Sequence, residues 1–214
     1  MKFLALRSAL IATANELNDS GINQGTSGNL SVRTESGFLI TPSGMNYSSL
    51  KPEHVVFMNL SGEHSSSCKP SSEWRFHRDI YVARTDAGAI VHTHSVYATA
   101  LACLNRPIPA FHYMVAAAGG RNIRCAPYAT YGTQDLSDFA VAALVGRKAC
   151  LLSHHGVISL GDGLSPALAL AAEVETLAKQ YLAALSVAEP ELLSDTEMDL
   201  VIEKFKAYGA NAQQ

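Results

Sequence analysis

The segment Ala-Ile-Val-His-Thr-His at residues 89–94 decides how the rest of the chain is interpreted. A short apolar run of this kind predicts a buried β-strand. Side chains two residues apart on a strand lie on the same face, so His92 and His94 can converge on one cation. The alternative is that both imidazoles are simply buried and hydrogen-bonded to the backbone. The pair alone leaves both interpretations open.

A third histidine favours the metal interpretation. His155 lies in the run Ser-His-His-Gly at 153–156 and can supply a third nitrogen. A fourth position then remains for a carboxylate, a water or a substrate. Three histidines with an open position are typical of a catalytic zinc, whereas a structural zinc normally closes its shell with cysteines. The sequence therefore predicts a catalytic metal centre.

Charge is scarce in the stretches that carry these histidines. Charged residues make up 16% of the 214 residues and the net charge is −3, whereas about 25% is usual for globular domains. Only Arg106 is charged between residues 87 and 120, and only Asp162 between residues 149 and 172. The low share of charged residues and the slightly negative net charge argue against a disordered chain and against a basic nucleic-acid binder. A low-charge surface is what an oligomer with sites at its interfaces needs.

The patterns on either side of residues 89–94 indicate an α/β protein of the α+β type, with a single domain spanning residues 1–214. Strand-like runs come in short, hairpin-like groups with helical patterns beside them. This favours a mostly antiparallel central sheet covered by helices over a doubly wound parallel sheet. We expect strands at 29–33, 38–41, 55–59, 89–94, 149–153 and 157–160. We expect helices from Leu4 to near Gly21, at 72–84, 95–104 and 135–145, from a Ser165-Pro166 start, and from a capping box at 194–197 to near Gly209.

The compartment is expected to be the cytoplasm. No apolar run approaches the roughly 20 residues of a membrane span, so no membrane partner is expected. The four cysteines form no CxxC pair, a pattern typical of reduced, mostly buried thiols in a cytoplasmic protein.

Three turns rich in Gly, Ser and Thr predict an anion site. They are Gly25–Asn29, Thr41–Gly44 and Lys69–Ser72, and the third opens a helix. Backbone amides and serine hydroxyls at a helix N-terminus bind phosphate readily. Three ordinary turns are the alternative. Glu73 follows directly and either complements the helix dipole or serves as a general base beside a metal and a phosphate.

Taken together, these motifs give the chain a resemblance to the class II aldolase/adducin family. The resemblance is carried by NQGTSGNLSVR, LITPSG, PSSEWRFH, PIPAFHYMVAAAGG, APYATYGT and SHHG, and it covers nearly the whole chain. It implies a class II, metal-dependent aldolase, an aldehyde-lyase with one Zn²⁺ per subunit. It also implies a homotetramer whose active sites lie between subunits.

The resemblance implies a role for each matching position. His92, His94 and His155 match the zinc-binding histidines, and Glu73 matches a catalytic carboxylate that can also ligate the metal. Tyr113 matches a proton donor that acts across the subunit boundary. Tyr208 matches a C-terminal tyrosine that closes over the aldehyde end of the substrate. The substrate and phosphate segments correspond to Thr26, Ser27, Gly28, Asn29, Ser43, Gly44, Ser71 and Ser72.

Three positions depart from the family pattern. Ser27 replaces an alanine, Ser43 replaces a threonine, and Tyr131 replaces a phenylalanine that helps line the aldehyde pocket. Ser43 is expected to bind phosphate equally well. Ser27 and Tyr131 bear on which aldehyde fits.

The implied reaction is cleavage of a 2-ketose 1-phosphate between C3 and C4, giving dihydroxyacetone phosphate and an aldehyde. The resemblance favours L-fuculose 1-phosphate or a close analogue, with an L-lactaldehyde-like product. Alternatives are a 5-deoxy- or methylthio-pentulose 1-phosphate, and epimerisation or dehydration of a pentulose phosphate on the same scaffold. A non-enzymatic, adducin-like binding protein is a further alternative, which the retained metal histidines disfavour.

Overall fold

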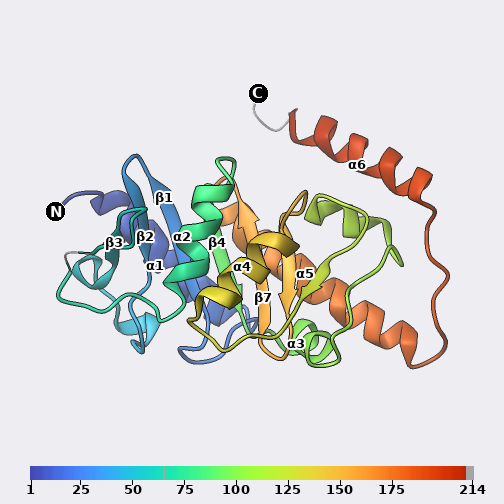
Figure 1. Cartoon of the computed structure of the whole chain (residues 1–214), viewed down its shortest axis with the longest axis horizontal. Helices are drawn as coiled ribbons and strands as arrows, with labels where there is room; N and C mark the ends of the chain where they lie inside the picture. Colours follow the sequence, from blue (N-terminus) through green and yellow to red (C-terminus); the bar gives the residue numbers. More distant parts are fainter. Residues whose placement is uncertain (65, 211–214) are drawn as a thin grey trace.

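Seven strands form one sheet in the order β3-β2-β1-β4-β7-β6-β5 in the computed structural model of the chain (Figure 1). The strands are β1 (Asn29–Thr34), β2 (Gly37–Ile40), β3 (Val56–Met58), β4 (Ala89–Thr93), β5 (Arg124–Ala126), β6 (Ala149–Leu152) and β7 (Gly156–Gly161). Neighbouring strands are antiparallel except β5 and β6, which are parallel. The structure describes residues 1–64 and 66–210, with the backbone alone for 206–210.

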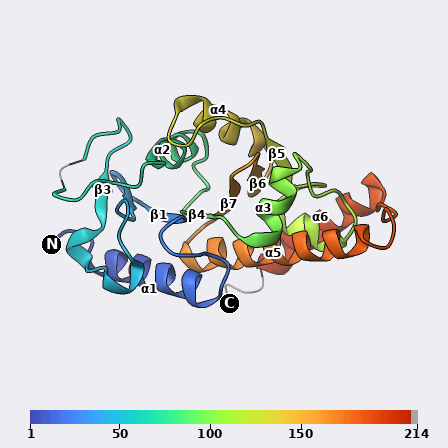
Figure 2. The ribbon, with the colours of Figure 1, turned by 90° about the horizontal axis from the view of Figure 1, so that it is seen from below.

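Helices cover both faces of this sheet, as Figure 2 shows edge-on. On one face lie α2 (Trp74–Ala83) and α4 (Gln134–Ala143), and on the other lie α1 (Leu4–Asp19), α3 (Val96–Cys103) and α5 (Leu164–Leu185). The expected fold class, a mostly antiparallel sheet covered by helices, is confirmed. None of the described helices combines the length and the apolar character that a membrane span requires.

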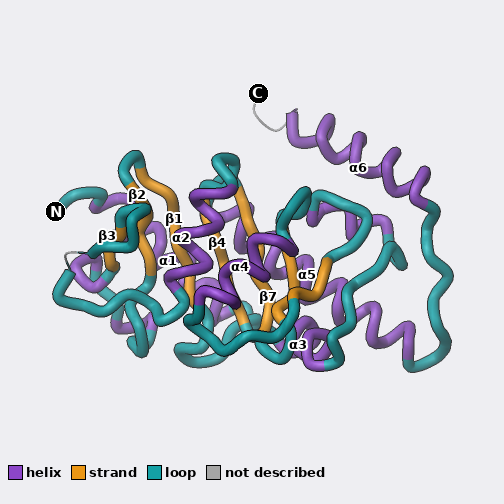
Figure 3. Tube along the Cα trace, in the orientation of Figure 1, coloured by secondary structure: helices purple, strands orange, loops and turns teal. Residues whose placement is uncertain are grey.

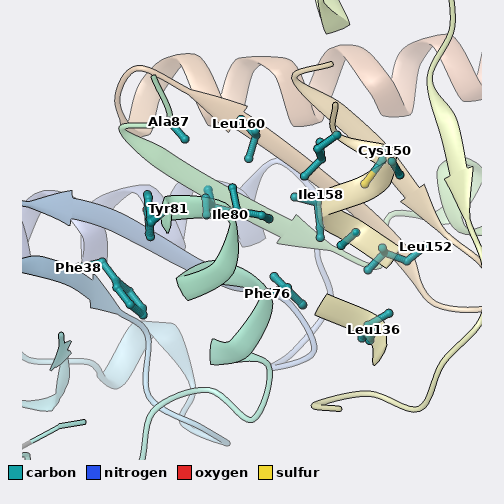
Figure 4. Close-up of a cluster of buried hydrophobic side chains, with 14 of the residues drawn as sticks. Phe38, Phe76, Ile80, Tyr81, Ala87, Leu136, Cys150, Leu152, Ile158 and Leu160 are labelled. Atoms are coloured by element: carbon teal, nitrogen blue, oxygen red, sulfur yellow. The ribbon is translucent and has the colours of Figure 1, made fainter. Parts of the chain in front are cut away.

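The central strand β4 divides its side chains between two apolar cores. Ile90 packs with Phe76 and Ile80 of α2 in the core drawn in Figure 4. Ala89 and Val91 face the opposite core, beneath α1 and α5. Because side chains alternate along a strand, His92 shares the face of Ile90 and points toward α2.

The last helix, α6 (Asp195–Ala210), lies apart from the sheet and is reached through a long loop (Figure 3). It packs against η3, a 3-10 helix at Tyr113–Ala118, with Met198 fully buried. Arg121 pairs with both Asp195 and Asp199 of α6. Ser194 Oγ accepts a hydrogen bond from Glu197 N, so the expected N-terminal cap is confirmed.

Two helix starts differ from expectation. α2 begins at Trp74 instead of Ser72. α5 begins at Leu164, ahead of the expected start at Ser165-Pro166. Gly163 O accepts from Ala167 N, so Ser165 lies inside the first turn. Sequence patterns also missed β5 and η3, because three-residue strands and 3-10 turns carry too little periodicity to detect.

Candidate metal centre and substrate site

Four side chains converge at one end of β4. The ligand atoms of Glu73, His92, His94 and His155 all lie within 4.8 Å of one another. His92 Nε2 is 3.0 Å from His94 Nε2 and 3.2 Å from Glu73 Oε2, and His155 Nε2 is 3.1 Å from Glu73 Oε1. The three rings stand edge to face with centroids 4.8 to 4.9 Å apart. The structure therefore brings together the four residues that the sequence proposed as metal ligands.

The backbone of β7 fixes the tautomer of His92. His92 is fully buried, and its Nδ1 lies 3.0 Å from the carbonyl oxygen of Val157. A carbonyl only accepts hydrogen bonds, so Nδ1 carries the proton and Nε2 directs a lone pair into the cluster. A backbone or carboxylate acceptor on the far ring nitrogen is the usual partner of a metal-binding histidine.

A tight turn delivers His155 to the cluster. The β6–β7 hairpin turns at Ser153–His155, with His154 in the left-handed region at φ +54°. A Cβ at Gly156 would lie 2.3 Å from Thr93 O, so glycine is required where β7 passes β4. His154 itself lies beside Asn105 and Tyr128, away from the cluster. His154 lies in the hairpin turn and not on a strand.

Glu73 precedes α2 yet does not cap it. Its side chain makes no hydrogen bond to the helix backbone and is only 5% exposed. Burial disfavours its ionised form, but His92 and His155 outweigh burial and hold the pKa of Glu73 well below its usual range. The contacts of this carboxylate with the two histidines favour the metal-site interpretation over the helix-dipole one.

The donor set fits a divalent metal ion. Two Nε2 atoms that face each other at 3.0 Å beside a buried carboxylate need a proton or a cation between them. Burial, together with His92 and His155, lowers the pKa of His94 to about 4, so this ring is neutral at pH 7, as a ligand must be. Three imidazoles and a carboxylate suit zinc better than magnesium or calcium.

The three turns predicted to hold phosphate lie together next to this cluster. Ser43 N donates to Lys69 O and Ser71 N donates to Thr41 O, both at 3.0 Å, which joins the second and third turns. Leu30 N donates to Thr41 Oγ1, which ties the second turn to the strand that follows the first. The turns therefore converge near the N-terminus of α2.

The residues of these turns differ in their exposure and in their hydrogen bonds. Ser43, Gly44 and Ser72 are exposed, and Gly44 has φ +69°. Ser71 is buried, and its Oγ accepts from Glu73 N. Thr26 and Ser27 are exposed on the first turn, where the Ser27 hydroxyl donates to Gln24 O.

Two residues of the first turn, Gly28 and Asn29, lie directly beside the cluster. A Cβ at Gly28 would lie 2.7 Å from His92 O, so glycine allows the turn to pass β4. The Asn29 side chain is 4% exposed and donates to Glu73 Oε2 at 2.9 Å. Its amide therefore holds the carboxylate. The sequence did not indicate this contact.

The loop carrying Tyr131 lies over the third turn. A Cβ at Gly132 would lie 2.9 Å from Ser72 O, and Arg75 of α2 donates to Gly132 O at 2.8 Å. Tyr131 is 67% exposed. The expected place of Tyr131 in an aldehyde pocket stays a prediction.

The other two tyrosines are not part of the cluster within one chain. Tyr113 is 51% exposed and begins η3, which packs chiefly against α5 and α6. Tyr208 falls within the backbone of α6, and its side chain lies outside the described residues.

Comparisons with known proteins identify the family and the fold of this chain. Residues 8–182 match the family model described as Class II Aldolase and Adducin N-terminal domain. A 5-methylthioribulose-1-phosphate/5-deoxyribulose-1-phosphate aldolase of Rhodospirillum rubrum is 57% identical over 210 residues, covering 98% of this chain and 95% of the relative. The L-fuculose phosphate aldolase of Escherichia coli K12 is 51% identical over 210 residues, covering 98% of both chains. A solved L-fuculose 1-phosphate aldolase superposes with a TM-score of 0.93 at 42% identity, covering 96% of this chain and 98% of that one.

The fold carries a Glu/His cluster that could hold a metal ion, next to three turns rich in Gly, Ser and Thr. The chain belongs to the class II aldolase and adducin family. It is a class II aldolase, and so an aldehyde-lyase, which excludes the non-enzymatic alternative.

Proposed function

We propose that the chain cleaves a 2-ketose 1-phosphate between C3 and C4 into dihydroxyacetone phosphate and a small aldehyde. The observation that carries this proposal is the convergence of the three turns beside Glu73 and the histidines. Phosphate held at the N-terminus of α2 would place C1 to C3 of the substrate next to the carboxylate. Ser43, Gly44, Ser71 and Ser72 are the proposed phosphate contacts in the second and third turns.

In this proposal Glu73 handles the proton at C3. In the synthetic direction its ionised carboxylate removes a proton from C3 of dihydroxyacetone phosphate, and the electron pair left on C3 forms the bond to the aldehyde carbon. Tyr113 gives its phenolic proton to the aldehyde oxygen. Cleavage reverses each transfer: Tyr113 takes the C4 hydroxyl proton and Glu73 returns a proton to C3.

The cluster is proposed to hold one Zn²⁺ per subunit through His92, His94 and His155, with Glu73 as a further ligand. Such an ion supplies Lewis acidity that polarises the ketone oxygen of the substrate. His92 contributes a preset lone pair, because its other nitrogen is held by Val157 O.

We further propose that the active unit is a homotetramer in which Tyr113 reaches the cluster of a neighbouring copy. Tyr113 is exposed and begins an element that packs away from its own cluster. The charge-poor stretch 87–120 also exposes the large apolar side chains Val96, Tyr97 and Leu104. Burial within one chain already explains part of the scarcity of charge, because β4, β6 and β7 lie inside the sheet and are buried. That part is not evidence for an interface.

Three substrates, taken from the names of two relatives, compete within this proposal. L-Fuculose 1-phosphate is the substrate that the sequence motifs favoured, and the Escherichia coli relative carries that name. The Rhodospirillum rubrum relative, at 57% identity, favours 5-methylthioribulose 1-phosphate or 5-deoxyribulose 1-phosphate. Each of these would leave dihydroxyacetone phosphate and an aldehyde that ends in a methyl or thiomethyl group, so the phosphate half of the site is common to them.

Cleavage of these three ketose 1-phosphates, coupled to detection of dihydroxyacetone phosphate, tests the function. We expect product from at least one, and kcat/KM ranks the aldehyde halves. An epimer or a dehydrated product without dihydroxyacetone phosphate would overturn the proposed cleavage. Ribulose 5-phosphate serves as the control because its phosphate is at the wrong end, and we expect no cleavage of it.

A further inference from the structure

A line of buried polar side chains leads away from Glu73 through the core under α2. Asn29 Nδ2 lies 2.9 Å from Glu73 Oε2, and Asn29 Oδ1 lies 2.6 Å from His77 Nε2. His77 Nδ1 lies 2.7 Å from Ser31 Oγ, which lies 2.8 Å from the Tyr81 hydroxyl. Five residues thus form one continuous chain of hydrogen bonds.

The secondary structure explains why these side chains meet. Glu73, His77 and Tyr81 are spaced by four residues at the start of α2 and along one face of it. Asn29 and Ser31 are two residues apart on β1, so both point to that face of the sheet. The helix and the strand supply alternate members of the chain.

The direction of every hydrogen bond follows from the carboxylate. Ionised Glu73 only accepts, so Asn29 donates through Nδ2 and turns Oδ1 toward His77. His77 must then donate through Nε2, which leaves Nδ1 to accept from the Ser31 hydroxyl. The Ser31 oxygen in turn accepts from Tyr81. All four donors point toward Glu73, and hydrogen bonds aligned in this way polarise one another.

The surroundings prevent water from replacing any member. His77 and Ser31 are fully buried and Tyr81 is 1% exposed, among the apolar residues Phe38 and Phe76 (Figure 4). Burial, with His92 nearby, lowers the pKa of His77 to about 3, so the ring carries the single proton that the chain requires. A core of this kind packs well with apolar residues alone, and those residues would carry no desolvation penalty.

We propose that His77 is a positioning residue for Glu73, acting through Asn29, with Ser31 and Tyr81 holding its ring and tautomer. With its orientation set by His77, the Asn29 amide holds Oε2 of the Glu73 carboxylate, and His155 lies beside Oε1. The proposal rests on the proposed catalytic role of Glu73. It assigns one N–H of the Asn29 side-chain amide to the carboxylate.

Steady-state kinetics of variants at His77, Ser31 and Tyr81, at increasing distance from Glu73 along the chain of hydrogen bonds, test this assignment. His77→Leu removes the donor to Asn29 and should lower kcat about 10- to 100-fold, the range seen when partners of a metal ligand are lost. His77→Gln should recover part of that loss, because its amide nitrogen can donate to Asn29. Ser31→Ala and Tyr81→Phe act further along the chain and should cost progressively less.

A matched control lies in the same sheet. Ser159 is also fully buried, and its hydroxyl donates to Ala167 O without reaching Glu73. Ser159→Ala should therefore leave kcat at the wild-type value at comparable thermal stability. If Ser31→Ala and Ser159→Ala lower kcat equally, or if His77→Leu keeps wild-type kcat, the proposal is wrong. A rise in KM with unchanged kcat would mean that these residues act on substrate binding and not on Glu73, and would overturn the proposal equally.

Nitrogen NMR of the histidine-labelled protein gives a readout that does not depend on turnover. We expect His77 to be neutral with Nε2 protonated from pH 5 to 9, and Asn29→Ala to shift its Nε2 resonance. A proton on Nδ1 would overturn the chain of donors. If Glu73→Gln keeps turnover while the His77 tautomer is as expected, the proposed role of Glu73 has failed and the hydrogen-bond chain has not.

Discussion

The two ends of the proposed active site are built in different ways. The metal end is buried at Glu73 and His92 and half-buried at His94 and His155. It is assembled within one chain from four segments: the turn before α2, the end of β4, the β6–β7 hairpin and the start of β1. The tyrosine end consists of Tyr113 and Tyr131, which are 51% and 67% exposed. A buried, hydrogen-bonded cluster is complete in a single chain, whereas exposed tyrosines are groups that a second copy can complete.

The largest effect is expected at the metal end. Removing divalent metal with a chelator should abolish cleavage, and Zn²⁺ should restore it because three imidazoles and a carboxylate form its site. Mg²⁺ should not restore it, since that ion prefers oxygen ligands and water. The measurement is the rate of dihydroxyacetone phosphate release after dialysis. Full activity in metal-free buffer would contradict the assignment of the cluster.

The next effect concerns Glu73. Glu73→Gln keeps the size of the side chain and loses the base, so turnover should fall about 100- to 10,000-fold while the three histidines still bind metal. Turnover and metal content are measured on the same sample. Glu63→Gln, on an exposed loop, is the control and should behave as wild type. Near-normal turnover of the Glu73 variant would remove this residue from the mechanism.

A smaller loss is expected at the tyrosine end. Tyr113→Phe removes one proton donor and no metal ligand, so we expect kcat to fall about 100-fold with metal content unchanged. Tyr97→Phe, in the same charge-poor stretch, is the control for general effects on assembly. If Tyr113→Phe leaves kcat unchanged, the exposed region plays no part in proton transfer.

The smallest effect is on stability and depends on pH. His77 has a folded pKa of about 3, below the roughly 6.5 of an unfolded histidine, so the unfolded chain binds more protons in between. His77 therefore contributes stability that is complete above pH 6.5 and is lost as the pH falls toward 3. The expected slope is about 1.4 kcal/mol per pH unit within that window.

Urea unfolding at pH 7, 6 and 5 measures this slope. His77→Gln cannot titrate and should unfold with a shallower dependence on pH than the wild type. Ser159→Ala, a buried substitution that does not titrate, should run parallel to the wild type. A His77→Gln slope equal to that of the wild type would contradict the buried neutral state of this ring.

Most of the fold was predictable because its central elements have strong patterns. The run 89–94 and the spacing of two on a strand placed His92 and His94 on one face, and the Ser-His-His-Gly turn added His155. The parallel pairing of β5 with β6 was not predictable, since three residues carry no readable period.

The interior of the site was less predictable than its ligands. Nothing in the sequence pattern shows that His77 contacts Asn29 or that Asn29 reaches Glu73. The contact depends on the register of β1 against β4, where Asn29 pairs with His92, and on the packing of α2 over that pair. The one available signal was the spacing of Glu73, His77 and Tyr81 along a helix face that is otherwise apolar.

Mixing two inactive variants tests most directly whether the metal end and the tyrosine end come from different copies. Glu73→Gln and Tyr113→Phe chains are combined, dissociated and reassembled, and dihydroxyacetone phosphate release is measured against each variant alone. In random mixed oligomers about a quarter of the sites combine an intact Glu73 with an intact Tyr113 from a neighbour, so about a quarter of wild-type activity should return. No recovery from mixed oligomers would show that both residues act within one chain.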